Sequence, residues 1–255
     1  MNSIKVAVIF SLFLCLSADA EDFFKTTYSF KNLSLNYLNW SSRTKEESLQ
    51  KDFTYLQLEA GAGFNWGSFY MFADIDNPTR DYAKEPMHNR RFVFKPIVDV
   101  KLFDTPWHIY TQSYNLKSKT FYVSNTIAGL SYKITDENLL FEPFLAPHYQ
   151  QSSYYSGMNG YMFGWFLKYN FTLLGEKFFI MNWHEHEFKR AKANYLGEDG
   201  VPMGDGKSKG VQGSLSFWWH IHKHLTLGLQ YRYADAKLGY DGYQNAVIYS
   251  IRHYF

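Results

Sequence analysis

Cysteine is almost absent from this chain, and so is any long apolar run after the N-terminus. The single cysteine, Cys15, lies in an N-terminal stretch that we predict to be removed, and Leu14 precedes it where a lipidated cysteine would follow a small residue. Disulfide scaffolds and thiolate metal sites are therefore excluded. No later stretch has the roughly 18 consecutive apolar residues that indicate a transmembrane helix. The formal net charge is only +2, which is not the basic balance of a nucleic-acid-binding protein.

The first 20 residues have the features of a secretory signal peptide. Lys5 supplies a positive charge, an apolar run follows from Val6 to Leu16, and the small residues Ala18 and Ala20 flank Asp19 at a cleavage site. The apolar run is shorter than the roughly 20 residues that a membrane-spanning helix needs. We therefore expect residues 1–20 to be cleaved and residues 21–255 to form the mature protein.

Aromatic residues are abundant instead, at 20% of the chain, with 21 Tyr and 23 Phe. A soluble globular protein needs no such excess. A transmembrane β-barrel does, because girdles of aromatic side chains mark both of its membrane interfaces. A cysteine-free, secreted, aromatic-rich chain of moderate polarity therefore favours an outer-membrane barrel.

The last stretch, Gly242–Phe255, alternates between two faces. Tyr249 and Ile251 fall on an apolar face with the terminal Phe255, and Ser250 and Arg252 fall on the other. Such alternation predicts a half-buried strand. A soluble sandwich could end on such a strand, but the stretch also suits the closing strand of a barrel, with its apolar face toward lipid and its mixed face toward the lumen.

Alternating stretches separated by Gly, Pro, Asn and charged residues predict twelve strands. They lie near 28–40, 52–64, 66–75, 90–102, 106–115, 120–133, 138–150, 160–171, 176–188, 210–221, 224–233 and 243–255. Long connections, including 152–159 and 234–241, alternate with short ones such as His222–Lys223. This alternation predicts an up-and-down, 12-stranded antiparallel transmembrane β-barrel with short periplasmic turns and longer outer loops. Greek-key connections of a sandwich would not produce it.

Several short segments, taken in order, resemble the Tsx and OmpK family of nucleoside-specific channel-forming outer-membrane proteins. The segments are Tyr55–Glu59, Trp66–Asp74, Phe92–Pro96, Gly160–Tyr161 and Phe179–Glu185. The resemblance covers nearly the whole mature chain, and it rests on the order and spacing of these segments because each alone is made of common barrel residues. It implies a Gram-negative outer-membrane channel for passive uptake of nucleosides and similar small solutes, without enzymatic activity or a cofactor.

The chain departs from the family pattern on two strands. Val93, Lys95 and Ile97 stand where the family tends to carry inward carboxylates and an arginine, and Met162 and Gly164 stand where inward Arg and Lys are common. These departures concern the identity of the solute rather than the fold.

Charged residues on the predicted strands must face the lumen, because an Arg or Lys facing lipid at mid-depth costs about 2–4 kcal/mol. This condition fixes the inner face of each strand. Aromatic rings on that face could stack on a nucleoside base for about 1–3 kcal/mol each, and carboxylates and amides could bond to ribose hydroxyls. The alternative is that these side chains simply fill a narrow barrel. Our candidate solute-binding residues are Tyr55, Glu59, Tyr70, Phe72, Asp74, Tyr110, Gln112, Trp183, Glu185 and Arg232.

Histidines suggest metal sites only by composition. In the segment His184–Glu187 the two histidines and the two glutamates fall on opposite faces of a strand, so they cannot form one four-ligand cluster. We predict no metal site. We place the histidines in the aromatic girdles, together with Trp218, Trp219, His220, His222 and His224 near a short turn.

Two other functions stay open from the sequence. The outer loops could act as an adhesin or a bacteriophage receptor on a barrel without specific transport. An outer-membrane phospholipase is less favoured, because we find no Ser and His close together with a third polar group to orient them.

We expect the barrel to contact outer-membrane lipid. The family resemblance also implies that the barrel-assembly machinery recognises the terminal Phe255. Deleting Phe255 should lower the amount of folded protein in the outer membrane, measured by surface labelling. Replacement of the lipid-facing Ile251 by Val is the control, and normal surface levels of the deletion variant would count against this role.

Overall fold

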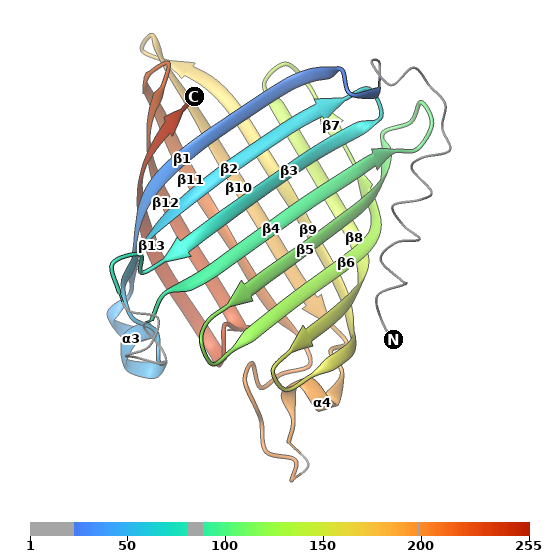
Figure 1. Cartoon of the computed structure of the whole chain (residues 1–255), viewed down its shortest axis with the longest axis vertical. Helices are drawn as coiled ribbons and strands as arrows, with labels where there is room; N and C mark the ends of the chain where they lie inside the picture. The colour runs from blue at the N-terminus through green and yellow to red at the C-terminus, as the bar shows by residue number, and fades with distance from the viewer. Residues whose placement is uncertain (1–22, 81–88, 198) are drawn as a thin grey trace.

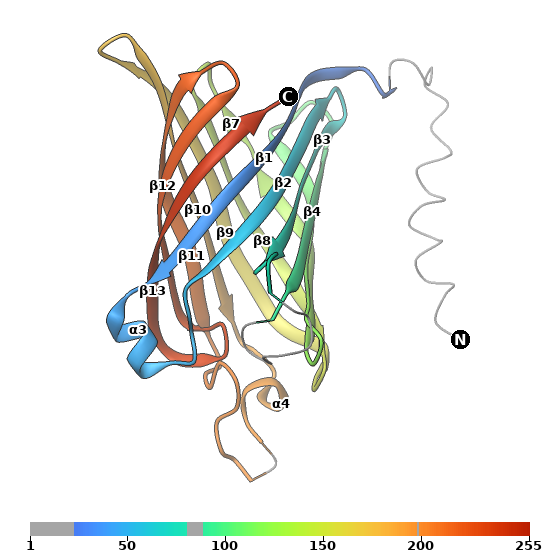
Figure 2. The same ribbon diagram turned by 60° about the vertical axis from the view of Figure 1, so that its left-hand side comes forward.

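The computed structural model describes residues 23–80, 89–197 and 199–255, and its strands form one antiparallel sheet that closes on itself (Figures 1 and 2). The predicted signal peptide, residues 1–20, lies outside the described residues. No helix within these ranges has the length and apolar character needed to cross a membrane. The strands are β1 (Thr26–Trp40), β2 (Phe53–Phe64), β3 (Gly67–Asp76), β4 (Arg91–Lys101), β5 (Trp107–Lys117), β6 (Tyr122–Tyr132), β7 (Ile134–Thr135), β8 (Leu139–Ser152), β9 (Ser156–Leu173), β10 (Glu176–Phe188), β11 (Gly210–His222), β12 (Leu225–Lys237) and β13 (Tyr240–Tyr254).

The sheet closes at two places. β1 pairs with β13, with Leu35 opposite Ile251, and β6 pairs with β8. The two-residue β7 follows β6 after Lys133 and pairs with the same strand, β8. The wall therefore has twelve strands, which confirms the predicted 12-stranded up-and-down barrel.

The two ends of the barrel differ, as Figure 1 shows. The two short helices α3 (Ser42–Glu47) and α4 (Lys192–Tyr195) lie at one end, which we call the loop end. At the other end, the turn end, tight connections such as Leu174–Gly175 join the strands, and the chain terminates there. This arrangement agrees with short turns on one side of a membrane and longer loops on the other.

Helix α3 is fixed to the rim of the loop end by its first turn. The Oγ of Ser41 accepts a hydrogen bond from the backbone N of Thr44 at 3.2 Å, as an N-cap does. Ser41 also donates to Oδ1 of Asn245 on β13 at 2.8 Å. The connection between β1 and β2 is thereby attached to the strand that closes the barrel.

Two predicted loops at the loop end are shorter than expected. Only Ser153–Tyr155 separates β8 from β9, and only Leu238–Gly239 separates β12 from β13. The predicted ranges 152–159 and 234–241 were therefore wrong at these two connections. The ladder between β12 and β13 continues to Lys237, whose inward ammonium binds Glu187 and so favours continuation of the strand.

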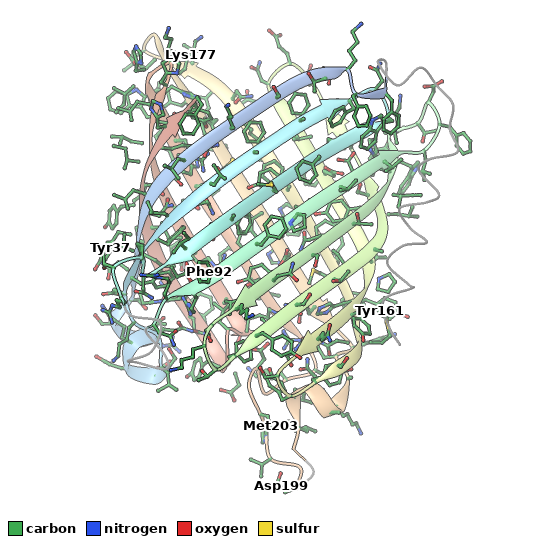
Figure 3. All side chains as sticks on the ribbon, in the orientation of Figure 1. Tyr37, Phe92, Tyr161, Lys177, Asp199 and Met203 are labelled. Carbon is green, nitrogen blue, oxygen red and sulfur yellow. The ribbon has the colours of Figure 1, made fainter. Side chains whose placement is uncertain are left out.

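Side chains alternate between a polar inner face and an apolar outer face along the wall. On β1, Ser34 and Asn36 are each 1% exposed while Leu35 between them is 48% exposed. Figure 3 shows Tyr37 and Tyr161 projecting from the outside of the wall. The outer face therefore presents the apolar surface that hydrocarbon requires.

The terminal strand has the orientation predicted from its sequence. Tyr249, Ile251 and Phe255 are exposed on the outer face, and Arg252 is buried inside. The girdle assignment was wrong for His220, whose ring lies 5.1 Å from that of the inward-facing Phe179, and for Trp218, which is fully buried on the inner face. Its ring lies over Gly228 of β12, where a Cβ would overlap it, so the ring fills the space that the missing side chain leaves.

The wall between β6 and β8 depends on Gly129. In the ladder between these strands, Ile127 pairs with His148 and Leu130 pairs with Leu145. The regular pairing is interrupted between these two pairs, where Pro147 has no N–H to donate. A Cβ on Gly129 would meet the backbone carbonyl of Leu145 and would lie 2.6 Å from the Cα of Ala146. Only glycine allows this close approach of the two strands.

Replacement of Gly129 by Val should therefore lower the free energy of unfolding by about 1–3 kcal/mol through overpacking. Ala128→Val is the matched control, because Ala128 precedes it on the exposed outer face. Urea unfolding in lipid vesicles, followed by tryptophan fluorescence, measures both. Equal stability of the two variants would contradict the importance of this contact.

Candidate functional site in the lumen

The structure places all ten candidate residues on the inner face of the barrel. Some are buried there outright, including Tyr55, Glu59, Tyr110, Gln112 and Glu185. The others contact inward side chains or have buried polar atoms. These are Tyr70, Phe72, Asp74, Trp183 and Arg232. Their common position confirms the face assignment made from the charges.

Glu185 on β10 is the centre of a hydrogen-bonded group that crosses the lumen. Its Oε1 lies 2.8 Å from Nζ of Lys95 on β4 and accepts a hydrogen bond of 2.8 Å from Nε2 of Gln112 on β5. Its Oε2 accepts from Nε2 of Gln212 on the adjacent strand β11 at 2.7 Å. Tyr110 extends the group by donating to Oε1 of Gln112 at 2.9 Å. We call Lys95, Gln112, Glu185 and Gln212 the lumenal bar.

The bar joins strands that are not neighbours in the sheet. β6, β8 and β9 lie between β5 and β10, so Lys95 and Gln112 reach Glu185 through the lumen rather than along the wall. Gln112 and Glu185 are only 4% and 6% exposed. The bar therefore narrows the passage at this height.

Trp183 and Arg232 adjoin the bar. The guanidinium of Arg232 lies 4.6 Å from the centre of the Trp183 ring, and Nζ of Lys95 lies 5.5 Å from it. Arg232 also donates to Oε1 of Gln212 at 3.1 Å. These contacts combine cation–π attraction with hydrogen bonding in a desolvated place, where both are stronger than in water.

A second group surrounds Glu59. Oη of Tyr70 donates to its Oε1 at 2.6 Å, and Nη2 of Arg252 lies 2.7 Å from its Oε2. Phe72 is two residues after Tyr70 on β3, and the two ring centres are 6.4 Å apart. Glu59, one of the ten candidate residues, is thus already paired with a cation and a phenol.

Asp74, two residues further along β3, differs from the other lumenal carboxylates. Among the described residues, its buried Oδ1 has no hydrogen-bond partner. A buried acceptor without a donor costs about 1–3 kcal/mol. Asp74 is therefore an acceptor that a hydroxyl group of a solute could satisfy.

A third group lies near the loop end and was not predicted. Glu187 binds Lys237 at 2.5 Å and Nε of Arg190 at 2.7 Å. Arg190 also donates to the carbonyl of Ala236 at 2.9 Å, and Asn194 of α4 accepts from Gln150 of β8 at 3.1 Å. The connection between β10 and β11 is thereby held against the inner rim.

The sequence contained part of the signal for these groups. Glu187 shares its face with Glu185 by period-two alternation, and it could have been included for that reason. Lys95 and Arg252 also fall on the inner face by the same rule. Alternation does not say which strands face each other across the lumen, so the partners themselves could not be predicted.

One family model matches this chain, and several solved outer-membrane barrels are similar to it. The model of the family described as nucleoside-specific channel-forming protein, Tsx, matches residues 35–255. The NanC porin structure is similar with a TM-score of 0.50 at 12% identity, covering 87% of this chain and 98% of that chain. The KdgM porin has a TM-score of 0.49 at 9% identity and covers 88% and 99%, respectively. Outer membrane phospholipase A from Escherichia coli has a TM-score of 0.46 at 15% identity, over 90% and 92%.

At such low identity, the likeness to the NanC porin supports the barrel fold alone. The family match carries the assignment, because it extends over most of the chain and includes every wall strand from within β1 to the C-terminus. The closed barrel, its apolar outer face and its polar inner face fit that match. The chain belongs to the family of Tsx nucleoside-specific channel-forming proteins, which are outer-membrane β-barrels of Gram-negative bacteria.

Proposed function

We propose that this protein is a passive channel in which nucleosides bind transiently to the inner face of the barrel. The base stacks on lumenal rings, and the sugar hydroxyls bond to lumenal carboxylates and amides. The observation that carries the proposal is the row of Tyr70, Phe72 and Asp74 on one face of β3, in which Oδ1 of Asp74 has no hydrogen-bond partner among the described residues.

The row suits a nucleoside because its parts match the two ends of such a molecule. Residues at i, i+2 and i+4 of a strand share a face, so the two rings and the acid follow one another along the lumen. Rings offer sequence-tolerant stacking because every base has a π-face. A ribose hydroxyl can donate to the free carboxylate oxygen, and this contact offsets the desolvation of both groups.

The lumenal bar would make binding weak enough for release. A solute that passes it exchanges hydrogen bonds with Gln112, Glu185 and Gln212, whose partners are already present on the wall. Only the difference between the old and new hydrogen bonds contributes to binding, and this difference is small. Several weak sites in series permit entry without trapping.

Adenosine should therefore block single-channel current through the purified protein in planar bilayers, and a sugar of similar mass should block it much less. Phe72→Ala should weaken the adenosine block about tenfold, since one stacking contact contributes roughly 1–3 kcal/mol, and Tyr70→Ala should do likewise. Tyr249→Ala removes a ring from the outer face and is the matched control. Equal block by adenosine and the sugar, or unchanged block in both lumenal variants, would reject this use of the row.

Replacement of Glu185 by Ala should raise the single-channel conductance, because Lys95, Gln112 and Gln212 lose the group that holds them across the lumen. The same change should lower the free energy of unfolding by about 3–5 kcal/mol, since it leaves the ammonium of Lys95 buried without its partner. The double variant Lys95→Met, Glu185→Met should keep the higher conductance and recover stability. A conductance equal to that of the wild type in both variants would show that the bar does not narrow the passage.

A further inference from the structure

Lys168 on β9 is a cation inside the barrel, on the same face of its strand as the buried Met162 and Gly164. Its Nζ lies 5.0 Å from the centre of the Phe179 ring on β10. In the described ranges, no hydrogen bond or ion pair is made by this ammonium. Most other lumenal cations are paired, as Lys95 is with Glu185 and Arg252 is with Glu59. Arg232 donates a hydrogen bond to Gln212.

The surroundings of Lys168 are aromatic and positively charged. Phe179 lies parallel to Trp218, with 5.7 Å between ring centres and 6° between planes. Arg252 covers the Trp218 ring at 3.9 Å, and the His220 ring lies 5.1 Å from that of Phe179. Of these two stacked rings, Phe179 thus contacts the Lys168 ammonium and Trp218 contacts the Arg252 guanidinium. The His220 ring lies beside Phe179.

The nearby carboxylates do not neutralise this region. Glu59 is already held by Arg252 at 2.7 Å and by the hydroxyl of Tyr70 at 2.6 Å. Glu176, at the turn end of β10, accepts a hydrogen bond of 3.2 Å from Nε1 of Trp219, which is an outward-facing ring. Both carboxylates are thus held by other groups, and the ammonium of Lys168 can still bind a mobile anion.

A hollow of about 520 Å³ lies at the same end of the barrel, between two turns. Figure 3 shows Lys177 at this end, opposite the loop that carries Asp199 and Met203. Basic groups dominate the lining, in which Glu176 is the one acid. The lining residues are Gly175, Glu176, Lys177, His220, His222 and Lys223. Lys177 and His220 belong both to this hollow and, by alternation, to the inner face near Phe179.

We propose that Lys168, together with Lys177 and His220, forms an anion-binding station at the turn end of the lumen that accepts the phosphate group of a small phosphorylated solute. This inference rests on the proposed function, because the solute must pass through the channel. It extends the solutes from neutral nucleosides to phosphate esters such as nucleoside monophosphates. Ammonium groups bind phosphate as compact point charges with freely rotating donors. A cleft lined by charge of one sign also concentrates counter-ions of the opposite sign.

The test uses the full mature protein in planar bilayers, with AMP, adenosine and gluconate as probes. AMP should block the current of the wild type, and Lys168→Met should weaken that block about tenfold, as expected for loss of one charge-assisted contact. The same variant should shift the reversal potential in a potassium phosphate gradient toward cation selectivity and leave the adenosine block within about twofold of the wild type. Lys168→Arg should retain the AMP block, because it keeps the charge.

Lys51→Met is the matched control, since Lys51 is an exposed lysine in the connection between β1 and β2 at the loop end. It should change neither the block nor the selectivity. If Lys168→Met fails to insert, Lys168→Gln replaces it in the same measurements. An AMP block and a reversal potential equal to those of the wild type in the neutral variants would overturn the station.

The probes separate this station from the nucleoside channel. Equal block by AMP and gluconate would overturn the assignment to phosphate, because it would show that any anionic group is accepted. The wild type could be blocked by AMP in a Lys168-dependent way and not by adenosine. This result would support the station and count against nucleoside binding at Tyr70, Phe72 and Asp74. Block of the wild type by adenosine, without any block by AMP, would support the nucleoside channel and overturn the station.

Discussion

Backbone hydrogen bonding in a medium without water is the constraint on which this structure depends. Each unpaired N–H or C=O group in hydrocarbon costs several kcal/mol, so a sheet in the membrane must have no free edge. The pairings of β1 with β13 and of β6 with β8 remove the edges. The close contact at Gly129 and the short turns serve the same closure, because each keeps strands in register beside a proline or a tight connection.

Closure in turn decides where the charges lie. The outer face must be apolar, so every charged residue of the wall strands between the rims projects into a narrow space shared with the other strands. There the charges have little water to solvate them, and they are stabilised mainly by one another. The resulting groups around Glu59, Glu185 and Glu187 lie at successive heights of the lumen. The solute path is thus built from the same contacts that make the buried charges tolerable. Within the described part of the chain, Oδ1 of Asp74 has no hydrogen-bond partner and the ammonium of Lys168 forms no ion pair.

The sequence predicted the wall well because period-two alternation and aromatic content are properties of single strands. Tyr249, Ile251 and Arg252 could be placed on their faces without any knowledge of the partner strand. The sequence predicted the lengths of two outer connections poorly. Near Lys237 the strand continues through polar residues, and their pairing depends on contacts with distant parts of the chain. The contact of Lys95 with Glu185 could not be foreseen either, since it joins strands separated by four others. Trp218 was misplaced because its site depends on Gly228 of the neighbouring strand.

The pairing of β1 with β13 differs from the others in one respect that concerns synthesis of the chain. Other wall strands pair with a partner close in the sequence, whereas Leu35 meets Ile251, from the opposite end of the chain. The backbone N of Phe255 extends this seam by donating to the carbonyl of Lys31 at 3.2 Å. Formation of this seam therefore carries the entropic cost of closing a loop that spans nearly the whole barrel. A chain released before its last strand would carry two open edges, which are templates for pairing with other chains, so a truncated product is an aggregation hazard rather than a smaller channel.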